Sequence, residues 1–348
     1  MIFLGEKMST NTTLPPGVVR NSNEEYHGGA GISASGLKML DKSPLHFWAE
    51  YLDPYKPDED RKAAFVIGSA VHCAVLEAHD FPHRYGIKPD VSGATLKGKA
   101  LAAYLESPEA FLANHQPVPD GIGKTKEGKA LVAEIEANGK AAMDESVFQF
   151  AVANGEPLYG KELLKQDEYD DVMAMAGCLL THHAGTYLLS MNGHAELSLY
   201  WNDPVTGVLC KCRPDYLIEP CEQFPNGLIL DLKTTEDASP AGFTKSAYNF
   251  GYHIQAAWYT HGFQTCFKTK APPPFVFVVV EKKRPYGRAF YYAGENQLLL
   301  GGVKWRELLN LYADCLKNGR WPSYPTEVTT LDLPGFALKE IEFLKGEK

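Results

Sequence analysis

The stretch Leu228-Ile229-Leu230-Asp231-Leu232-Lys233-Thr234-Thr235 is the most informative part of this 348-residue sequence. Its apolar residues predict a buried strand, and that strand carries an acid and a base two positions apart. Because side chains alternate across a strand, Asp231 and Lys233 emerge on one face, and the leucines beside them enter the other. Burying an acid and a base is costly unless they pair or meet another charge. A single Asp-x-Lys is most often a structural ion pair, so its neighbours in the sequence must be considered.

Two further acids stand on earlier candidate strands. Asp215 lies among strand-forming residues in the segment 213–217, and Glu196 opens the β-prone segment 196–201. Antiparallel pairing of successive strands would bring Glu196, Asp215 and Asp231 together. Converging carboxylates repel unless a cation holds them, and oxygen ligands favour Mg²⁺ or Mn²⁺ over zinc. A nearby lysine can then orient or deprotonate a water, or stabilise charge on a phosphate.

The order of these residues resembles a known nuclease signature. Glu196, Pro214-Asp215 and Asp231-Leu232-Lys233 are similar to the PD-(D/E)xK pattern. Within that superfamily, the segment 68–72 resembles the metal-binding histidine motif of RecB-type nucleases, and the segment 255–259 resembles their Gln-x-x-x-Tyr motif. The opening segments 33–37 and 43–47 resemble the start of the same group. Over about residues 26–315, the chain is similar to the RecE-type exonucleases (exonuclease VIII).

The resemblance assigns roles to individual residues. The implied metal ligands are His72, Asp215, Asp231 and the backbone carbonyl of Leu232, with Glu196 as a further acidic ligand. The implied catalytic residues are Lys233, Asp231, Asp215, Glu196, Gln255 and Tyr259. Lys233 would position the attacking water. Gln255 and Tyr259 share one helix face at i and i+4, and would support the site or touch DNA near the scissile phosphate.

The function that the resemblance implies is a Mg²⁺-dependent exodeoxyribonuclease acting on linear double-stranded DNA, with Mn²⁺ substituting for Mg²⁺. It also implies 5′→3′ digestion that leaves 3′ single strands for recombination by annealing. The implied partners are three further copies of the chain in a ring-shaped homotetramer, and a single-strand annealing protein of the RecT type. The implied setting is a bacterial host cytoplasm, with the gene carried by a phage or prophage.

Composition limits the class of protein and the way in which it could bind DNA. Apolar residues make up 45% and charged residues 22%, which excludes a disordered chain. The 43 acidic and 34 basic residues give a net charge of −9, so bulk charge does not attract nucleic acid. A basic DNA groove would have to be concentrated in a few places. The candidate phosphate contacts are Lys211, Arg213, Lys282, Lys283, Arg284 and Arg288, for which a solvated surface is the equal alternative.

Cysteines and apolar runs indicate the compartment and the absence of other cofactors. The seven cysteines are an odd number without framework spacing, which suits reduced thiols in a cytoplasm. Some relatives hold an iron–sulfur cluster through clustered C-terminal cysteines, but only Cys315 lies in that region, so we expect no cluster. Cys210 and Cys212 lack a second pair, so we expect no zinc site. No run approaches the ~20 apolar residues of a membrane span.

The predicted fold is α/β (α+β), a restriction-endonuclease-like core whose central mixed sheet is flanked by helices, with a largely helical N-terminal half. We expect a flexible arm over residues 1–28, with translation starting at Met1 or Met8, and an exonuclease domain over 29–320. That domain would contain a helical insert at about 80–193 and the catalytic sheet at about 194–292. One crossover helix is expected at about 241–263 and a closing helix at 296–318, before a C-terminal tail over 321–348.

Three other functions are compatible with parts of this pattern. A catalytically silent protein on the same fold would bind DNA ends or assist assembly, but it would be expected to have lost one of the acids or Lys233. A PD-(D/E)xK endonuclease would cut covalently closed circles as fast as linear duplex. A structural protein whose acids form surface ion pairs would have exposed and separated carboxylates.

Overall fold

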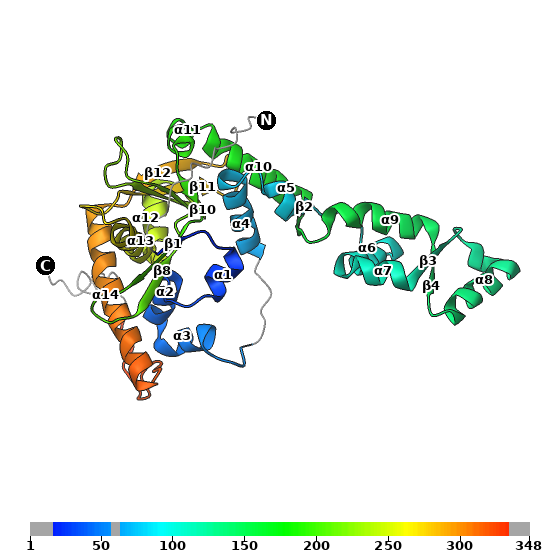
Figure 1. Ribbon diagram of the computed structural model, residues 1–348, viewed down its shortest axis with the longest axis horizontal. Coiled ribbons are helices and arrows are strands. Elements are labelled where there is room, and N and C mark those ends of the chain that lie inside the picture. Colours follow the sequence, from blue (N-terminus) through cyan, green and yellow to red (C-terminus); the bar gives the residue numbers. More distant parts are fainter. Residues whose placement is uncertain (1–16, 57–62, 334–348) are drawn as a thin grey trace, which may run out of the picture.

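The structure is a computed structural model that describes residues 17–56 and 63–333, and its centre is a five-stranded mixed sheet (Figure 1). The strand order is β12-β11-β10-β9-β6. These strands are β6 (His194–Ala195), β9 (Tyr216–Ile218), β10 (Leu228–Thr235), β11 (Phe275–Glu281) and β12 (Arg288–Tyr292). β10 and β11 run parallel, and the other neighbours are antiparallel. The mixed sheet and the helical N-terminal half confirm the predicted fold class.

The central strands are apolar on both faces because both faces are covered by helices. Along β10, Ile229 belongs to one apolar core, and Leu230 and Leu232 belong to the other. β11 alternates in the same way, with Phe277 on the first side and Val278 on the second. This period-2 alternation with no polar face is typical of a central strand in an α/β protein. Asp231 and Lys233 therefore interrupt a strand that otherwise belongs to the interior.

Two groups of helices cover the sheet. The first core is formed with α2 (Ala34–Lys42), α3 (Pro44–Tyr51), α12 (Pro240–Asn249), α13 (Tyr252–Phe267) and α14 (Glu295–Asn318). The second core is formed with α4 (Ala63–Leu76), α10 (Gln166–Leu180) and α11 (His183–Ser190). α13, which comes after β10 and α12 in the chain, lies on one face of the sheet and α4 lies on the opposite face, so the end of β10 is flanked by helices from two distant parts of the sequence (Figure 1).

Residues 17–28 contain a strand and a helix, which differs from the flexible arm expected over 1–28, and residues 1–16 of that arm lie outside the described residues. β1 (Val18–Val19) pairs with β7 (Ser198–Asn202), which pairs with β8 (Leu209–Cys212) in a second, three-stranded sheet. The following α1 (Asn23–Gly28) begins with a capping box between Ser22 and Glu25. The loose composition of this stretch hid β1 and the cap from the sequence prediction. The choice between Met1 and Met8 falls outside the described residues.

The insert extends away from the sheet as a long arm (Figure 1). Its helices are α5 (Phe81–Arg84), α6 (Leu96–Glu106), α7 (Pro108–Asn114), η1 (Ile122–Lys124), α8 (Lys126–Ala137), α9 (Glu145–Gly155) and η2 (Glu156–Leu158). Its strands form two parallel pairs, β2 (Tyr85–Ile87) with β5 (Glu162–Leu164), and β3 (His115–Val118) with β4 (Ala141–Asp144). α6 and α9 share a separate small core around Tyr104 and Phe111. The insert is therefore stabilised partly by its own packing.

Two details near the C-terminal half differ from the sequence prediction or refine it. The crossover expected at 241–263 is two helices, because Gly251 adopts φ +65 between α12 and α13. The closing helix expected at 296–318 is α14, and it ends where Gly319 adopts φ +64. Residues 320–333 form no helix or strand, and the rest of the expected tail lies outside the described residues.

Among the described helices, none has the length and apolar character that crossing a membrane requires.

An ion pair between α14 and the loop after β7 stabilises this part of the fold. Arg306 donates through both Nη atoms to Asp203, at 2.9 and 2.8 Å, and the Asp203 side chain is fully buried. Burial alone would raise the pKa of Asp203, but Arg306 and hydrogen bonds from Thr206 hold it far below its ordinary value. We expect Arg306→Leu to lower the free energy of unfolding by about 2 kcal/mol, because Asp203 then keeps only Thr206.

The sign of the pH dependence follows from the depressed pKa of Asp203. Its contribution is complete above the unfolded pKa of about 4 and is lost as the pH falls toward the lower folded value. Denaturant unfolding near pH 7 and near pH 3 should therefore show a smaller difference between the variant and the original chain at the lower pH. Arg320→Leu removes an exposed arginine just after α14 and serves as the control. An equal difference at both pH values would contradict the role given to Asp203.

Candidate active site

Pro214 creates the opening in the sheet where the candidate site lies. β9 pairs with β10 as far as Tyr216 opposite Leu230. Continued by two residues, this register would place Pro214, which has no N–H to donate, opposite Leu232. Beyond that point, the backbone N–H of Leu232 donates to Asp215 Oδ2 at 2.6 Å. The Asp215 carboxylate thus takes the place of a strand partner. The proline ends the ladder and the aspartate side chain occupies the gap.

His72 brings α4 to the same carboxylate. Its Nε2 lies 2.9 Å from Asp215 Oδ2, and its Nδ1 lies 2.8 Å from the Gly68 carbonyl oxygen one turn earlier. Both ring nitrogens therefore face acceptors, which favours the doubly protonated ring. Burial alone would lower the pKa of His72, but Asp215 and Gly68 outweigh burial and raise it to about 9. Burial opposes ionisation of Asp215 too, yet His72 holds the pKa of that carboxyl below its ordinary value.

Asp231 and Lys233 form an ion pair on the α13 side of β10. Asp231 is fully buried and its Oδ2 contacts the Lys233 ammonium, while Oδ1 accepts a hydrogen bond from Gln255 Nε2 at 2.9 Å. Burial raises the pKa of Asp231 to about 6, with Lys233 opposing the rise. Burial would lower the pKa of Lys233, but Asp231 and Asp215 together raise it. The ion pair expected for an isolated Asp-x-Lys is therefore present, but it lies near a second, half-buried carboxylate, that of Asp215.

Glu196 does not lie on a strand as the sequence suggested. It stands between β6 of the five-stranded sheet and β7 of the smaller sheet, with φ +50, in the left-handed region that non-glycine residues rarely adopt. Its backbone N–H donates to the Asp215 carbonyl oxygen at 3.1 Å. Burial, reinforced by Asp215, raises the pKa of Glu196 to about 8. The chain changes sheets at this residue, which period-2 patterning could not indicate.

Asp215, Asp231, Glu196, His72 and Lys233 together form the candidate active site. Asp231 is 0% exposed and the Asp215 side chain is 15% exposed, and the Asp215 charge acts on both Asp231 and Glu196. The carboxylates are thus neither exposed nor separated, which contradicts the alternative of a protein with surface ion pairs only.

The donor types at this centre suit a hard divalent cation. Carboxylate oxygens are the ligands that Mg²⁺ and Mn²⁺ prefer, and the buried Asp231 Oδ2 has the Lys233 ammonium as its partner but no conventional hydrogen bond. Within residues 17–56 and 63–333, no three His, Cys, Asp or Glu side chains form a group that could hold a metal ion as placed. The donors are instead engaged in pairs, His72 with Asp215 and Lys233 with Asp231. The ligand set, including the Leu232 carbonyl, stays a prediction.

α13 supplies three aromatic or polar side chains to this region. Gln255 contacts Asp231 as described, and Tyr259, one turn further, is buried with its ring centroid 6.3 Å from that of Phe275. Tyr252, three residues before Gln255, was missed by the sequence analysis, and its ring lies 5.0 Å from Lys233 Nζ. The signal was available, because positions 252, 255 and 259 share one helix face.

Two of the basic residues expected to contact DNA have a structural role instead, which corrects that prediction. Lys211 is buried, and its Nζ donates to the carbonyl oxygens of Tyr26 and Gly29 at 2.6 Å each. Arg213 is buried too, and its guanidinium donates to Ser198 and to the segment 21–23. Burial and these hydrogen bonds hold both side chains against other parts of the chain.

The other four basic candidates lie around the end of β11 and the start of β12. Lys282 Nζ forms an ion pair with Glu236 at 3.1 Å, while Lys283, Arg284 and Arg288 are exposed. Exposure is compatible with phosphate contacts and with a solvated surface alike, so their role in DNA binding stays a prediction.

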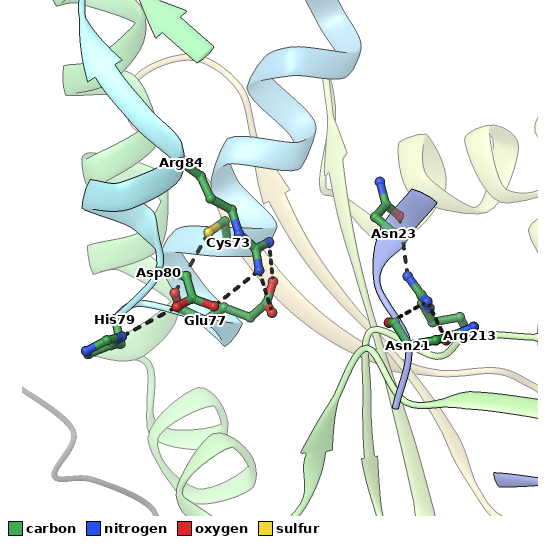
Figure 2. A network of polar contacts seen from close by, with 8 residues as sticks. All are labelled: Asn21, Asn23, Cys73, Glu77, His79, Asp80, Arg84 and Arg213. Carbon is green, nitrogen blue, oxygen red and sulfur yellow. Dashed lines mark hydrogen bonds and ion pairs between the residues drawn. The ribbon is translucent and has the colours of Figure 1, made fainter. Parts of the chain in front are cut away.

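A large cavity opens beside the site. It measures about 1010 Å³, and its walls include His72 and Glu196 as well as parts of α1, α4 and β2. Figure 2 shows two polar networks from these walls. In one, Arg84 donates to Glu77 at 2.8 and 3.1 Å and to Asp80 at 3.2 Å, and in the other Arg213 holds Asn21 and Asn23. The N-terminal segment is therefore part of the wall of the site.

Comparison with known proteins agrees with this arrangement. Residues 33–333 match the family described as "PDDEXK-like domain of unknown function (DUF3799)". The chain belongs to this family. The prediction that the chain belongs to the PD-(D/E)xK superfamily is thereby confirmed. The family match does not test the RecE-type assignment within that superfamily.

The chain was also compared with solved structures and with curated sequences. A crystal structure from Eubacterium rectale, described as a "putative exonuclease", is 13% identical with a TM-score of 0.49, covering 92% of this chain and 98% of that one. A structure of SSO0001 is also 13% identical, with a TM-score of 0.26, covering 62% of this chain and 84% of that one. No curated protein matches the chain.

Proposed function

We propose that the chain is a Mg²⁺-dependent exodeoxyribonuclease that degrades linear double-stranded DNA. The observation that carries the proposal is the meeting of Asp215, Asp231 and Lys233 where β9 leaves β10, with His72 on the Asp215 carboxylate. Membership of a PDDEXK-like family supports a nuclease in general. Digestion from ends, and the RecE-type assignment, rest on the sequence resemblance.

Each residue has a distinct role in this proposal. Asp215 and Asp231 would hold the cation together with His72, whose Nε2 would first lose the proton that faces Asp215. The Leu232 carbonyl and Glu196 would be further oxygen donors. When bound, Mg²⁺ neutralises charge on the phosphate and lowers the pKa of a bound water. Lys233 holds that water in line with the phosphorus. Gln255 fixes the orientation of the Asp231 carboxylate through its hydrogen bond.

The wider arrangement of the enzyme is proposed from the resemblance as well. It includes 5′→3′ polarity that leaves 3′ single strands, and a homotetrameric ring that encloses the DNA. It also includes a single-strand annealing partner of the RecT type and an origin in a phage or prophage. A closed ring requires that one surface of the chain meets a different surface on its neighbour.

The test compares linear duplex DNA with covalently closed circles of the same sequence. We expect Mg²⁺ or Mn²⁺ to support release of acid-soluble nucleotides from the linear DNA only, with EDTA abolishing it. Labels at the 5′ or the 3′ end then report the polarity. Degradation of circles at the same rate would replace the exonuclease by an endonuclease. Binding to DNA ends with no release of nucleotides would indicate a catalytically silent protein.

A further inference from the structure

A second lysine stands beside the site on a different helix. Lys38 of α2 lies with its Nζ 5.7 Å from the centroid of the Tyr252 ring, and Lys233 Nζ lies 5.0 Å from the same centroid. The Lys38 stem passes close to the start of α13, since a Cβ added to Gly251 would lie 2.9 Å from Lys38 Cδ. Two ammonium groups from distant parts of the sequence therefore flank one aromatic ring.

The carboxylates around Lys38 are already engaged by other cations. Asp41, one turn further along α2, forms an ion pair with Lys304 at 3.6 Å, and Asp231 contacts Lys233 and Gln255. In the part of the chain that the structure describes, no carboxylate pairs with Lys38. Burial, reinforced by the charge of Lys233, lowers the pKa of Lys38 to about 8. Lys38 is thus a half-buried ammonium beside a second ammonium, and no carboxylate of the described residues neutralises it. Such a group can bind an anion supplied by a ligand.

We propose that Lys38 binds a backbone phosphate of the DNA strand held at Lys233. The inference rests on the proposed nuclease function and identifies a residue that binds its substrate. Nucleic acid carries a negative phosphate at every nucleotide, so a strand placed at Lys233 brings further anions within reach of the neighbouring ammonium. Both ammonium groups lie within 6 Å of the Tyr252 ring centroid, so the ring stabilises both cations. The sequence held a signal for Lys38, which lies four residues after the buried Ala34 and so on the inner face of α2.

The experiment measures equilibrium binding of a short linear duplex in EDTA across a range of NaCl concentrations. A lysine that neutralises one phosphate contributes about 0.9 to the slope of log K against log salt on duplex DNA, or about 0.7 on a single strand. We expect Lys38→Met to reduce the slope by about that amount and Lys38→Arg to retain it. Lys42→Met is the matched control, because Lys42 is an exposed lysine of the same helix. Its slope should equal that of the original chain.

The outcomes separate this inference from the proposed function. An unchanged slope in Lys38→Met overturns the inference, and so does an equal loss in Lys42→Met or a failure of Lys38→Arg to retain the slope. Thermal unfolding of all three variants identifies a loss that is due to misfolding, and Lys38→Arg then decides the result. If the original chain shows the Lys38 contribution but releases no nucleotides with Mg²⁺ or Mn²⁺, the nuclease function fails while the phosphate contact stands.

Discussion

Asp231→Asn is expected to abolish the release of nucleotides from linear DNA, lowering the rate by more than about 100-fold. Substitution of groups that merely support metal ligands typically costs 10–100-fold, and Asp231 is proposed as a ligand itself. The change also removes the partner of Lys233, so the ammonium that orients the water loses its fixed position. Two parts of the proposed machinery are lost with one carboxylate.

The fold should survive this substitution. Asparagine has nearly the shape of aspartate and keeps an oxygen that accepts the hydrogen bond from Gln255. Nucleotide release and thermal unfolding are measured on the same preparations. Glu219→Gln is the control, because Glu219 is an acid that follows β9 and accepts a hydrogen bond from His194 at 2.7 Å. Undiminished activity of Asp231→Asn would remove Asp231 from the proposed mechanism.

The sequence was sufficient to predict the fold class because its central strands have a clear apolar pattern. An apolar strand that carries Asp231 and Lys233 has few explanations, and the apolar segment 275–280 supplies the parallel neighbour of β10. The proline before Asp215 was taken only as part of a motif. Its physical role, ending the β9–β10 ladder so that Asp215 can accept the Leu232 N–H, depends on the register of the two strands. Register is a tertiary property that local patterning leaves open.

The errors concern residues whose environment is set by distant segments. Lys211 and Arg213 alternate with apolar residues beside the site, which is compatible with a DNA-binding face. Apart from Ser198, the hydrogen-bond partners of their side chains lie about 180 to 190 residues earlier, in a stretch without apolar periodicity. Glu196 was placed on a strand because its neighbours are β-prone, but the chain leaves one sheet and enters another at this residue. Neither the contacts with the N-terminal segment nor the change of sheet at Glu196 can be predicted from the local sequence pattern.

Arg213→Leu is expected to release the N-terminal segment from the wall of the site. Arg213 donates to the Asn21 side chain and to the backbone carbonyls of Asn21 and Ser22, and its guanidinium carbon lies 4.2 Å from the centroid of the Tyr26 ring. Leucine satisfies none of these acceptors. A hydrogen bond to a charged group contributes about 1.5–3 kcal/mol, so losing this set should cost the segment about 3 kcal/mol. Because the segment can detach without unfolding the sheet, the loss should be local.

Hydrogen exchange over residues 17–28 measures this local stability. A loss of about 3 kcal/mol corresponds to exchange that is faster by about 150-fold, since 1.4 kcal/mol is a factor of ten. Amides of β10 and β11 serve as the internal reference and should keep their protection. Arg213→Lys keeps the charge but not the planar fork of donors, so it should give an intermediate value. Unchanged exchange in Arg213→Leu would mean that Lys211, which donates to Tyr26 and Gly29, holds the segment without Arg213.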